Sequence, residues 1–296
     1  MRFTNILLPM LLVIAALSAC DKPKPLTDAR YEVTDQLFTR IKQNVDEATN
    51  LQIIQEIDHS RLGNAAGSIM PPAKVLIFSN PWLETVLIQK NPLIALDLPL
   101  RILAYESVPG GESKVIYNSF KYLRSRYDLD ELKTVEAEYQ QSYSHALQGI
   151  DEQHLASFAN DQMNPDGIVT LTSNFEYSET IERVQAAIQS QDDTVGFGQV
   201  DFSARALEQG IILAPSTLIL FGGPAPGAKA MARAPTLGLD AFCQKFLVWE
   251  DGNGQVYLSF NDLIALAERQ DVKKSPALRV INYRLESVFS EALELN

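Results

Sequence analysis

One sequence pattern occurs twice in this chain, and the duplication limits the fold more than any other feature. The stretch PAKVLIFSNPWLETVLIQKNPLIALDLPLRILAYE at residues 72–106 returns as PSTLILFGGPAPGAKAMARAPTLGLDAFCQKFLVWE at residues 215–250. Many matching positions are 143 residues apart, among them Asp58 and Asp201, Pro72 and Pro215, Asp97 and Asp240, and Asn118 and Asn261. A period this long, kept through apolar runs and loops alike, indicates two copies of one globular domain.

The domain plan follows from this repeat. We expect a first repeat domain over residues 29–127 and a second, degenerate one over residues 174–271. The length of 296 residues suits two domains, each with its own core. Between them, residues 128–173 are polar and show helical spacing at Leu132, Val135 and Tyr139, so we expect a linker whose helices pack on the domains. A last amphipathic helix is expected over residues 272–296.

The first residues read as an export signal. Arg2 precedes an apolar run that is too short to cross a bilayer, and Leu17-Ser18-Ala19-Cys20 follows at once. These four residues resemble the lipobox of bacterial lipoproteins, in which the cysteine becomes the lipidated first residue. We therefore expect a signal peptide over residues 1–19, a lipid anchor on Cys20 and a tether over residues 20–28, in a periplasm-facing protein of the cell envelope. Asp21 weakly favours the inner membrane, and an ordinary cleaved signal is the alternative.

Composition excludes several kinds of partner. The formal net charge is −12 and the sequence has no basic run, so nucleic acid and anionic lipid surfaces are poor partners. Beyond Cys20 the only cysteine is Cys243, which we interpret as a buried small residue, with a reactive thiol as the alternative. His145 and His154 are too far apart in sequence to form a metal-binding pair on one helix, and no cofactor or metal is predicted.

Apolar spacing predicts the same order of elements in both copies. In the first, we expect a short strand near residues 30–33, a helix after Asp35, a strand into Asp58 and a short helix that ends at Gly67. A central buried strand at residues 74–78, further strands at 98–105 and up to 118, and a closing helix follow. Strands joined by tight turns and interleaved with helices predict an α+β sheet with helices on one side.

The ordered motifs of the first copy resemble the domain of unknown function 302 family. They are Ile57-Asp58-His59, the run from Val75 to Pro81, Asn91-Pro92, the run from Leu96 to Leu100, and Tyr105-Glu106. The second copy is similar but degraded, with Phe202, Gly223 and Asp240-Ala241-Phe242-Cys243 in place of the His, the Asn and the Asp-Leu-Pro-Leu run. The resemblance implies a TATA-binding-protein-like domain of strand, helix, four strands and helix, often paired as a dimer. Two fused copies would form an internal pseudo-dimer in a monomer. No settled activity is implied.

A few side chains are candidates for function. His59 changes to Phe202 in the second copy, although a residue required by the fold should persist in both, so His59 is a candidate general base or ligand contact. Asp97 and Glu106 are candidate catalytic partners, because a carboxyl beside an apolar run can be desolvated with its pKa raised. Asp97 is also a candidate structural carboxylate. Asn80, which Gly223 replaces, is a candidate ligand contact beside His59.

Two classes of function remain open. The favoured one is a non-catalytic lipoprotein that binds a small apolar ligand or an envelope protein. The alternative is a hydrolase or isomerase that uses His59 with Asp97 or Glu106. A pocket in the first copy with His59 in its wall favours the enzyme, and a concavity between the copies that excludes His59 favours binding.

Overall fold

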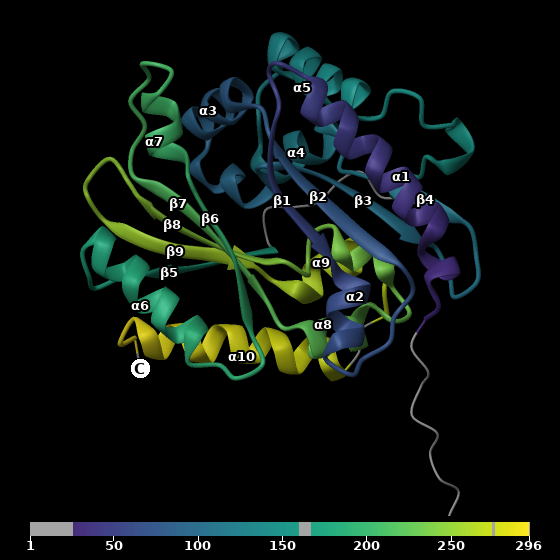
Figure 1. The fold of residues 1–296 in the computed structure, drawn as a ribbon. Coiled ribbons are helices and arrows are strands. Elements are labelled where there is room, and N and C mark those ends of the chain that lie inside the picture. The colour runs from purple at the N-terminus through teal and green to yellow at the C-terminus, as the bar shows by residue number, and fades with distance from the viewer. Residues whose placement is uncertain (1–25, 160–166, 274–275, 296) are drawn as a thin grey trace, which may run out of the picture.

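Each repeat forms an antiparallel sheet with its most apolar strand in the interior (Figure 1). The computed structural model describes residues 26–159, 167–273 and 276–295. Among these, the first sheet has four strands in the order β1 (Gln52–Asp58), β2 (Ala73–Ser79), β3 (Leu100–Glu106) and β4 (Ser113–Ile116). The second has five, in the order β5 (Ile168–Thr172), β9 (Val256–Asn261), β8 (Gln244–Glu250), β7 (Ser216–Gly222) and β6 (Val195–Asp201). The central buried strands predicted in both copies are β2 and β7.

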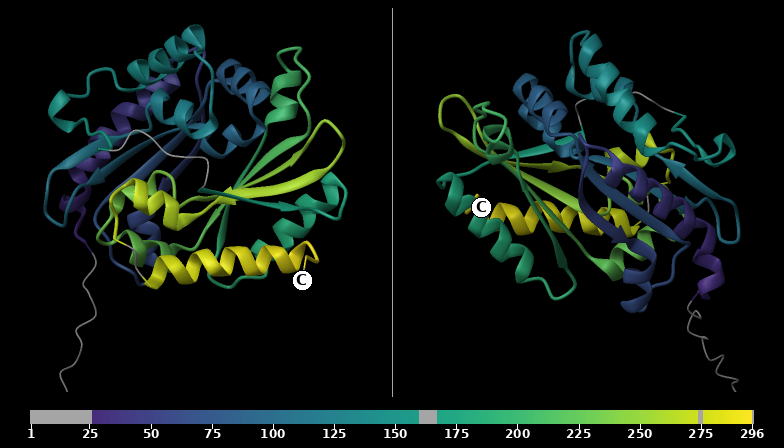
Figure 2. Two further views of the ribbon diagram at one scale, coloured as in Figure 1. Left: turned by 180° about the vertical axis from the view of Figure 1, so that it is seen from behind. Right: turned by 45° about the horizontal axis from the view of Figure 1, so that its top comes forward.

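Helices cover one face of each sheet (Figures 1 and 2). In the first copy, α1 (Asp28–Glu47) lies across the four strands, α5 (Lys133–Ala146) packs on α1, and α4 (Phe120–Tyr127) closes the domain. In the second, α6 (Tyr177–Gln189) packs on β6 and β8, and α10 (Pro276–Ala292) lies beside α6 and α9 (Leu263–Arg269). The linker helix α5 and the C-terminal helix α10 thus lie where the sequence predicts helices, with α10 beginning at Pro276 within the expected range 272–296. Residues 274–275 of that range lie outside the described residues.

The two copies differ at their first element. The strand expected near residues 30–33 is wrong, because α1 begins at Asp28 and includes these residues. Tyr31, Thr34 and Phe38 are all buried, and their spacing of three and four residues continues the helical stripe instead of alternating as in a strand. In the second copy the strand does form, as β5, which lies inside residues 128–173 and belongs to the second sheet, not to a linker.

Turn and cap residues behave as their chemistry suggests. Asp58 and Asp201 cap the short helices α2 (His59–Ala65) and α7 (Phe202–Leu207). Each aspartate accepts a hydrogen bond from the backbone amide three residues further along the chain, at 2.8 and 2.9 Å. Gly67 and Gly210 follow these helices with φ of +76° and +73°, a conformation in which glycine has no Cβ penalty. Both helix ends confirm the sequence prediction.

The copies meet through the sheet faces that the long helices leave uncovered. Lys74 lies over the ring of Phe38 on the α1 side, whereas Arg101 and Leu103 on β3 point away from α1 toward the second copy. The 3-10 helix η1 (Pro92–Asp97) of the first copy packs on β7, β8 and β9, and its counterpart η4 (Pro235–Gly238) packs on β2 and β3.

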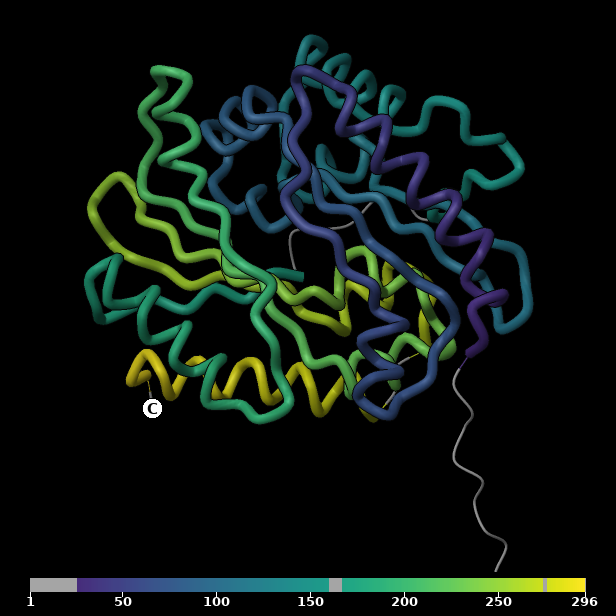
Figure 3. The backbone as a smooth tube through the Cα atoms, viewed as in Figure 1, coloured from purple at the N-terminus to yellow at the C-terminus, as the bar shows by residue number. Residues whose placement is uncertain are grey.

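Two helix contacts complete the interface between the copies. Helix α2 packs against α8 (Pro224–Met231), and α3 (Pro81–Lys90) packs against α7 (Figures 1 and 3). Since α2 corresponds to α7 and α3 to α8 in the repeat, each patch of one copy meets the matching patch of the other. This is the contact pattern of a two-fold dimer, made here within one chain.

Candidate functional site

His59 lies in the interface between the copies at the start of α2. The ring is buried, and its Nε2 lies 3.0 Å from the carbonyl oxygen of Gly238 in η4. A Cβ on Gly238 would lie 3.0 Å from His59 Cδ2, so this close approach requires the glycine. Burial lowers the pKa of His59 to about 4, against the opposing effects of the Gly238 carbonyl and Asp58. The imidazole is therefore neutral near pH 7, and its Nε2–H donates to Gly238.

A small pocket between the copies includes His59 in its wall. Its empty volume of about 290 Å³ is partly open to solvent. The lining residues are His59 and Leu62 of the first copy and Phe197, Met231, Phe242 and Cys243 of the second. This arrangement is neither a pocket of the first copy alone nor an inter-copy concavity without His59. Cys243 is buried, and burial raises the pKa of its thiol to about 11. A protonated, enclosed thiol favours the interpretation of Cys243 as a small buried residue.

Asp97 lies at the end of η1 in a different network. Its Oδ2 accepts from Arg126 Nη1 at 2.7 Å and from the hydroxyl of Tyr127 at 2.8 Å, and its side chain is fully buried. Burial alone would raise the pKa of Asp97, but Arg126, Lys245 and Arg101 outweigh it and hold the pKa below its usual range. The hypothesis of a raised Asp97 pKa is therefore wrong, because the carboxyl is desolvated together with cations.

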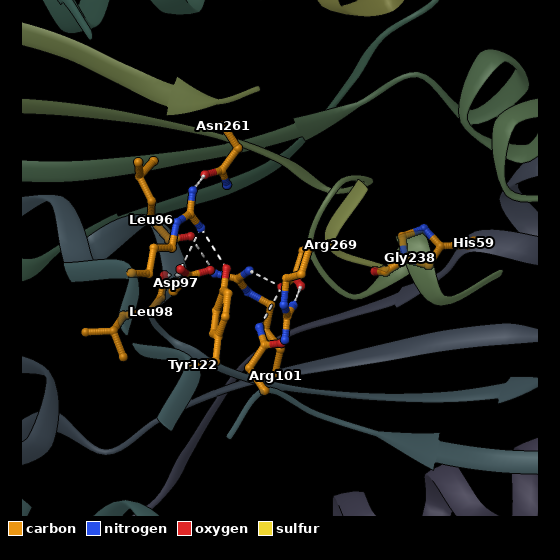
Figure 4. Close-up of polar contacts among 12 residues, drawn as sticks. His59, Leu96, Asp97, Leu98, Arg101, Tyr122, Gly238, Asn261 and Arg269 are labelled. Atoms are coloured by element: carbon orange, nitrogen blue, oxygen red, sulfur yellow. Dashed lines mark hydrogen bonds and ion pairs between the residues drawn. The ribbon is translucent and has the colours of Figure 1, made fainter. Parts of the chain in front are cut away.

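Asp97 belongs to a group of buried polar side chains at the centre of the interface (Figure 4). Asp240, its counterpart, accepts from Asn118 Nδ2 at 3.0 Å and pairs with Arg269 Nη1 at 3.2 Å and Arg101 Nη1 at 3.7 Å. Another contact between the copies joins Arg126 of the first to Asn261 of the second, with Arg126 Nη2 donating to Asn261 Oδ1 at 2.5 Å. We call this group the inter-copy cluster; its members are Asp97, Arg101, Asn118, Arg126, Asp240, Lys245, Asn261 and Arg269.

Most of the inter-copy cluster was visible in the spacing of the repeat. Arg126 and Arg269 are 143 residues apart, as are the paired aspartates and asparagines, so three polar residue types persist in both copies. The interpretation of Asp97 and Asp240 as structural carboxylates agrees with this arrangement. Their partners are side chains of other elements. The network joins the two copies.

Glu106 and Asn80 brace the first copy. Glu106 accepts from Arg30 Nη2 at 2.5 Å and from the backbone amide of Gly110, which ties the β3–β4 hairpin to α1. Asn80 caps α3 by accepting from Leu83 N at 3.2 Å, and its Nδ2 donates to Glu138 on α5 at 2.7 Å. Among the described residues, no hydrogen bond or ion pair joins His59 to Asp97, Glu106 or Asn80. The candidates belong to separate networks.

An apolar cavity that no sequence pattern predicted lies in the second copy. It lies between α6, α8 and α10 and has an empty volume of about 480 Å³ that is partly open to solvent, and we call it the α10 cavity. Its apolar lining includes Ile188, Phe221, Phe242, Ile281, Leu285 and Val288. At its rim, Arg284 pairs with Asp193 at 2.6 Å and donates to Gln191 at 2.5 Å. In the sequence, this cavity is reflected only in the apolar stripe of α10. That stripe predicts that one face of the helix is buried, but it does not predict a cavity between that face and its neighbours.

The α10 cavity and the His59 pocket are neighbours. Gly223, Gly227 and Phe242 line both, so one wall separates them. Within the described ranges, no group of three or more His, Cys, Asp or Glu side chains is arranged to hold a metal ion. None of the helices in those ranges is both long and apolar enough to cross a membrane. Cys20 and Asp21 lie outside the described residues.

Comparison with known proteins defines the family. Residues 28–150 and 169–292 each match the family described as Domain of unknown function DUF302. The chain therefore belongs to this family and carries its domain twice, which confirms the resemblance and the tandem α+β organisation read from the sequence. A structure described as an uncharacterized conserved protein DUF302 from Bacillus stearothermophilus covers 43% of this chain and 95% of its own, with 20% identity and a TM-score of 0.36.

Curated relatives match over a shorter region. Fluoride-specific ion channel FluC 1 of Brucella suis biovar 1 is 43% identical over 106 residues, which are 36% of this chain and 41% of that protein. Fluoride-specific ion channel FluC 2 of Brucella melitensis biotype 1 is also 43% identical over 106 residues, 38% of its length. The chain thus spans about two fifths of the length of the curated relatives that it matches.

Proposed function

We propose that this protein is a lipid-anchored envelope protein that binds a small apolar ligand in the α10 cavity. The observation that carries the proposal is the cavity itself, because helices α6, α8 and α10 leave between them a partly open space with an apolar lining. Its lining is mainly aliphatic and aromatic, which is the character of small-molecule sites. Burial of apolar ligand surface against such a lining contributes about 25 cal/mol per Å².

The rim of the α10 cavity favours an uncharged ligand. The Arg284 guanidinium is already held by Asp193 and Gln191, so this cation is not available to an acidic head group without breaking those contacts. Phe289 closes the inner side, with its ring centroid 4.1 Å from that of Phe246. A compact apolar molecule, or the apolar part of a larger one, fits these boundaries.

The leader pattern supports a position at the membrane. A lipid on Cys20 would hold the acidic body close to the bilayer, facing the periplasm, with Asp21 favouring the inner membrane. The curated relatives add support, since proteins named as ion channels act in membranes and contain a segment similar to this chain. Loss of labelled palmitate incorporation and of membrane fractionation in Cys20→Ala would support the anchor. Retention of both would contradict it.

Acid–base catalysis receives less support. His59 donates its Nε2–H to Gly238 and makes no hydrogen bond with Asp97 or Glu106 among the described residues. Glu106 is held by Arg30 and the hairpin backbone, and the Asp97 carboxylate by Arg126. Proton transfer between these groups would require each network to open.

A fluorescence titration tests ligand binding. The chain from Asp21 onward is titrated with N-phenyl-1-naphthylamine, an apolar dye that emits in dry surroundings. Val288→Trp fills the α10 cavity and should weaken binding about tenfold or more, the equivalent of about 1.4 kcal/mol. Val280→Trp is the matched control, since Val280 is on the same helix but 66% exposed. Equal binding by both variants, or none by the parent chain, would overturn the proposal.

A further inference from the structure

The inter-copy cluster contains more buried positive than negative side chains. Its charged members are Asp97, Asp240, Arg101, Arg126, Lys245 and Arg269, and each is at most 7% exposed. Four basic groups thus face two carboxylates in a region enclosed by both copies. A buried charge without a counter-charge is costly, so some interaction must offset this excess.

Several donors of the inter-copy cluster have no hydrogen-bond partner in the described structure. They are Lys245 Nζ, Asn261 Nδ2, Arg101 Nε, Arg126 Nε, and Nε and Nη2 of Arg269. Some acceptors are also unpaired, namely Asp97 Oδ1 and Asn118 Oδ1. Unpaired donors outnumber unpaired acceptors, so this buried region has more capacity to donate hydrogen bonds than to accept them.

Lys245 differs most from its counterpart. Arg101 occupies the matching position on β3 and donates through Nη2 to the carbonyl oxygens of Leu96 and Leu98 at 3.1 and 3.2 Å. Lys245 on β8 has a single ammonium group that makes no such contact, and the residue is only 3% exposed. The second copy therefore presents a buried cation where the first uses the same position to brace its own backbone.

We propose that the inter-copy cluster binds a small inorganic anion, with Lys245 as its principal charged ligand and Arg101 as a second cation beside it. Enclosure by both copies favours an ion of one or a few atoms, such as a halide, over an organic acid. The anion would accept from the unpaired donors and reduce the excess of positive charge. This site does not depend on the α10 cavity, from which it differs in lining and chemistry.

Binding at this site should couple to protonation. Burial lowers the pKa of Lys245 to about 7, with Arg101 acting in the same direction and Asp97 and Asp240 opposing it. Arg126 on α4 also faces Lys245, and Cys243 lies nearby on the same chain segment. Because an anion stabilises the charged ammonium, the anion should bind more tightly below pH 7, where Lys245 is protonated, than above pH 7.

Halide titrations at two pH values test this site. The chain from Asp21 onward is unfolded by heat in sodium fluoride or sodium chloride, against sodium gluconate of equal ionic strength. A bound anion should raise the midpoint saturably at pH 6, by roughly 2–4 °C at about five times its dissociation constant, and much less at pH 9. Fluorine NMR of free fluoride provides a direct reading, since binding broadens the signal.

Variants separate a specific site from general salt effects. Lys245→Met keeps the length of the side chain and removes the charge, so the halide effect should disappear. Lys121→Met, at an exposed position, is the control and should retain it. The proposal is overturned if neither halide raises the unfolding midpoint of the parent chain and the fluoride signal is not broadened by it. It is also overturned if Lys245→Met responds as the parent does. Because the NMR comparison of pH 6 and pH 9 needs no variant, poor folding of Lys245→Met would not rescue the proposal.

Discussion

The two ends of the interface between the copies share a backbone arrangement but use different chemistry. At one end, α2 meets α8, and His59 donates a neutral hydrogen bond to Gly238 beside a small apolar pocket. At the matching end, α7 meets α3, and Phe202 replaces the histidine. There Arg205 lies 3.7 Å from the buried carboxyl of Glu84 and donates to Ser79 at 2.6 Å.

This comparison separates scaffold from specialised positions. Asp97 and Asp240, with their arginines, persist in both copies because both halves of the interface need them. Leu62 faces the pocket at the His59 end, whereas its counterpart Arg205 carries the ion pair at the other end. Duplication thus kept the aspartates, arginines and asparagines of the central network and let the two ends diverge.

The largest effect should come from breaking the shared centre of the interface. Arg126→Met leaves Asp97 buried without its main partner and should cost about 3–5 kcal/mol of unfolding free energy. The matching change Arg269→Met should cost less, because Asp240 keeps Asn118 and Arg101. Urea unfolding measures both. Arg124→Met, at an exposed position, is the control, and equal losses for all three variants would contradict the network's role.

Glu84 should make the Arg205 end sensitive to pH. Burial raises the pKa of Glu84 from 4.5 to about 7, against weaker effects of Ser79 and Arg205. A raised carboxyl pKa contributes stability that is present below pH 4.5 and lost as the pH rises through about 7, up to about 3 kcal/mol. Glu84→Gln should remove this loss, so its stability relative to the parent should increase from pH 5 to pH 8.

Thermal unfolding across that pH range checks the prediction for Glu84. The control is Glu208→Gln, on the exposed surface after α7, which should follow the parent curve. If Glu84→Gln and the parent lose stability in parallel, Glu84 does not titrate in this window.

At the other end, His59 should respond to acid in the opposite sense. Its pKa is lowered from 6.5 to about 4 by burial, so it contributes stability above pH 6.5 that is lost as the pH falls through about 4. The loss between pH 6.5 and 5 should be about 2 kcal/mol. His59→Phe, which copies Phe202, should remove it.

A proton NMR titration provides a second test for His59. The ring signals of the exposed His145 serve as an internal reference in the same sample. The His59 signals should stay constant from pH 8 to pH 5, and a midpoint near 6.5 would show that the ring is not desolvated.

The smallest effect should come from the helix crossing at the His59 end. A Cβ on Gly63 would lie 2.3 Å from Cβ of Ala228, so Gly63→Ala should push α2 from α8. Overpacking typically costs about 1–3 kcal/mol, and the better helix propensity of alanine offsets about 1 kcal/mol of this. Gly196→Ala, where a Cβ meets nothing within 4 Å, is the control. A neutral Gly63→Ala would show that this crossing is loosely packed.

Local features could be predicted from the sequence because their causes are local. Asp58 and Asp201 cap helices through amides three residues along the chain, and Gly67 and Gly210 supply the left-handed backbone that ends the same helices. The apolar runs of β2 and β7 are buried because their own composition requires it. The repeat revealed two copies, since matching positions keep their spacing.

Only the tertiary structure decided what depends on distant neighbours. The first turns of α1 contain the residues expected as a strand, because Tyr31 and Thr34 pack as a helical stripe against the sheet. His59 is neutral because its ring is buried where the second copy packs on α2, beside Gly238, which is 179 residues away in sequence. Asp97 stays charged because Arg126, Lys245 and Arg101 share its buried site. Sequence spacing specifies which side chains can face one direction, whereas burial and charge partners depend on the surfaces that the folded copies bring together.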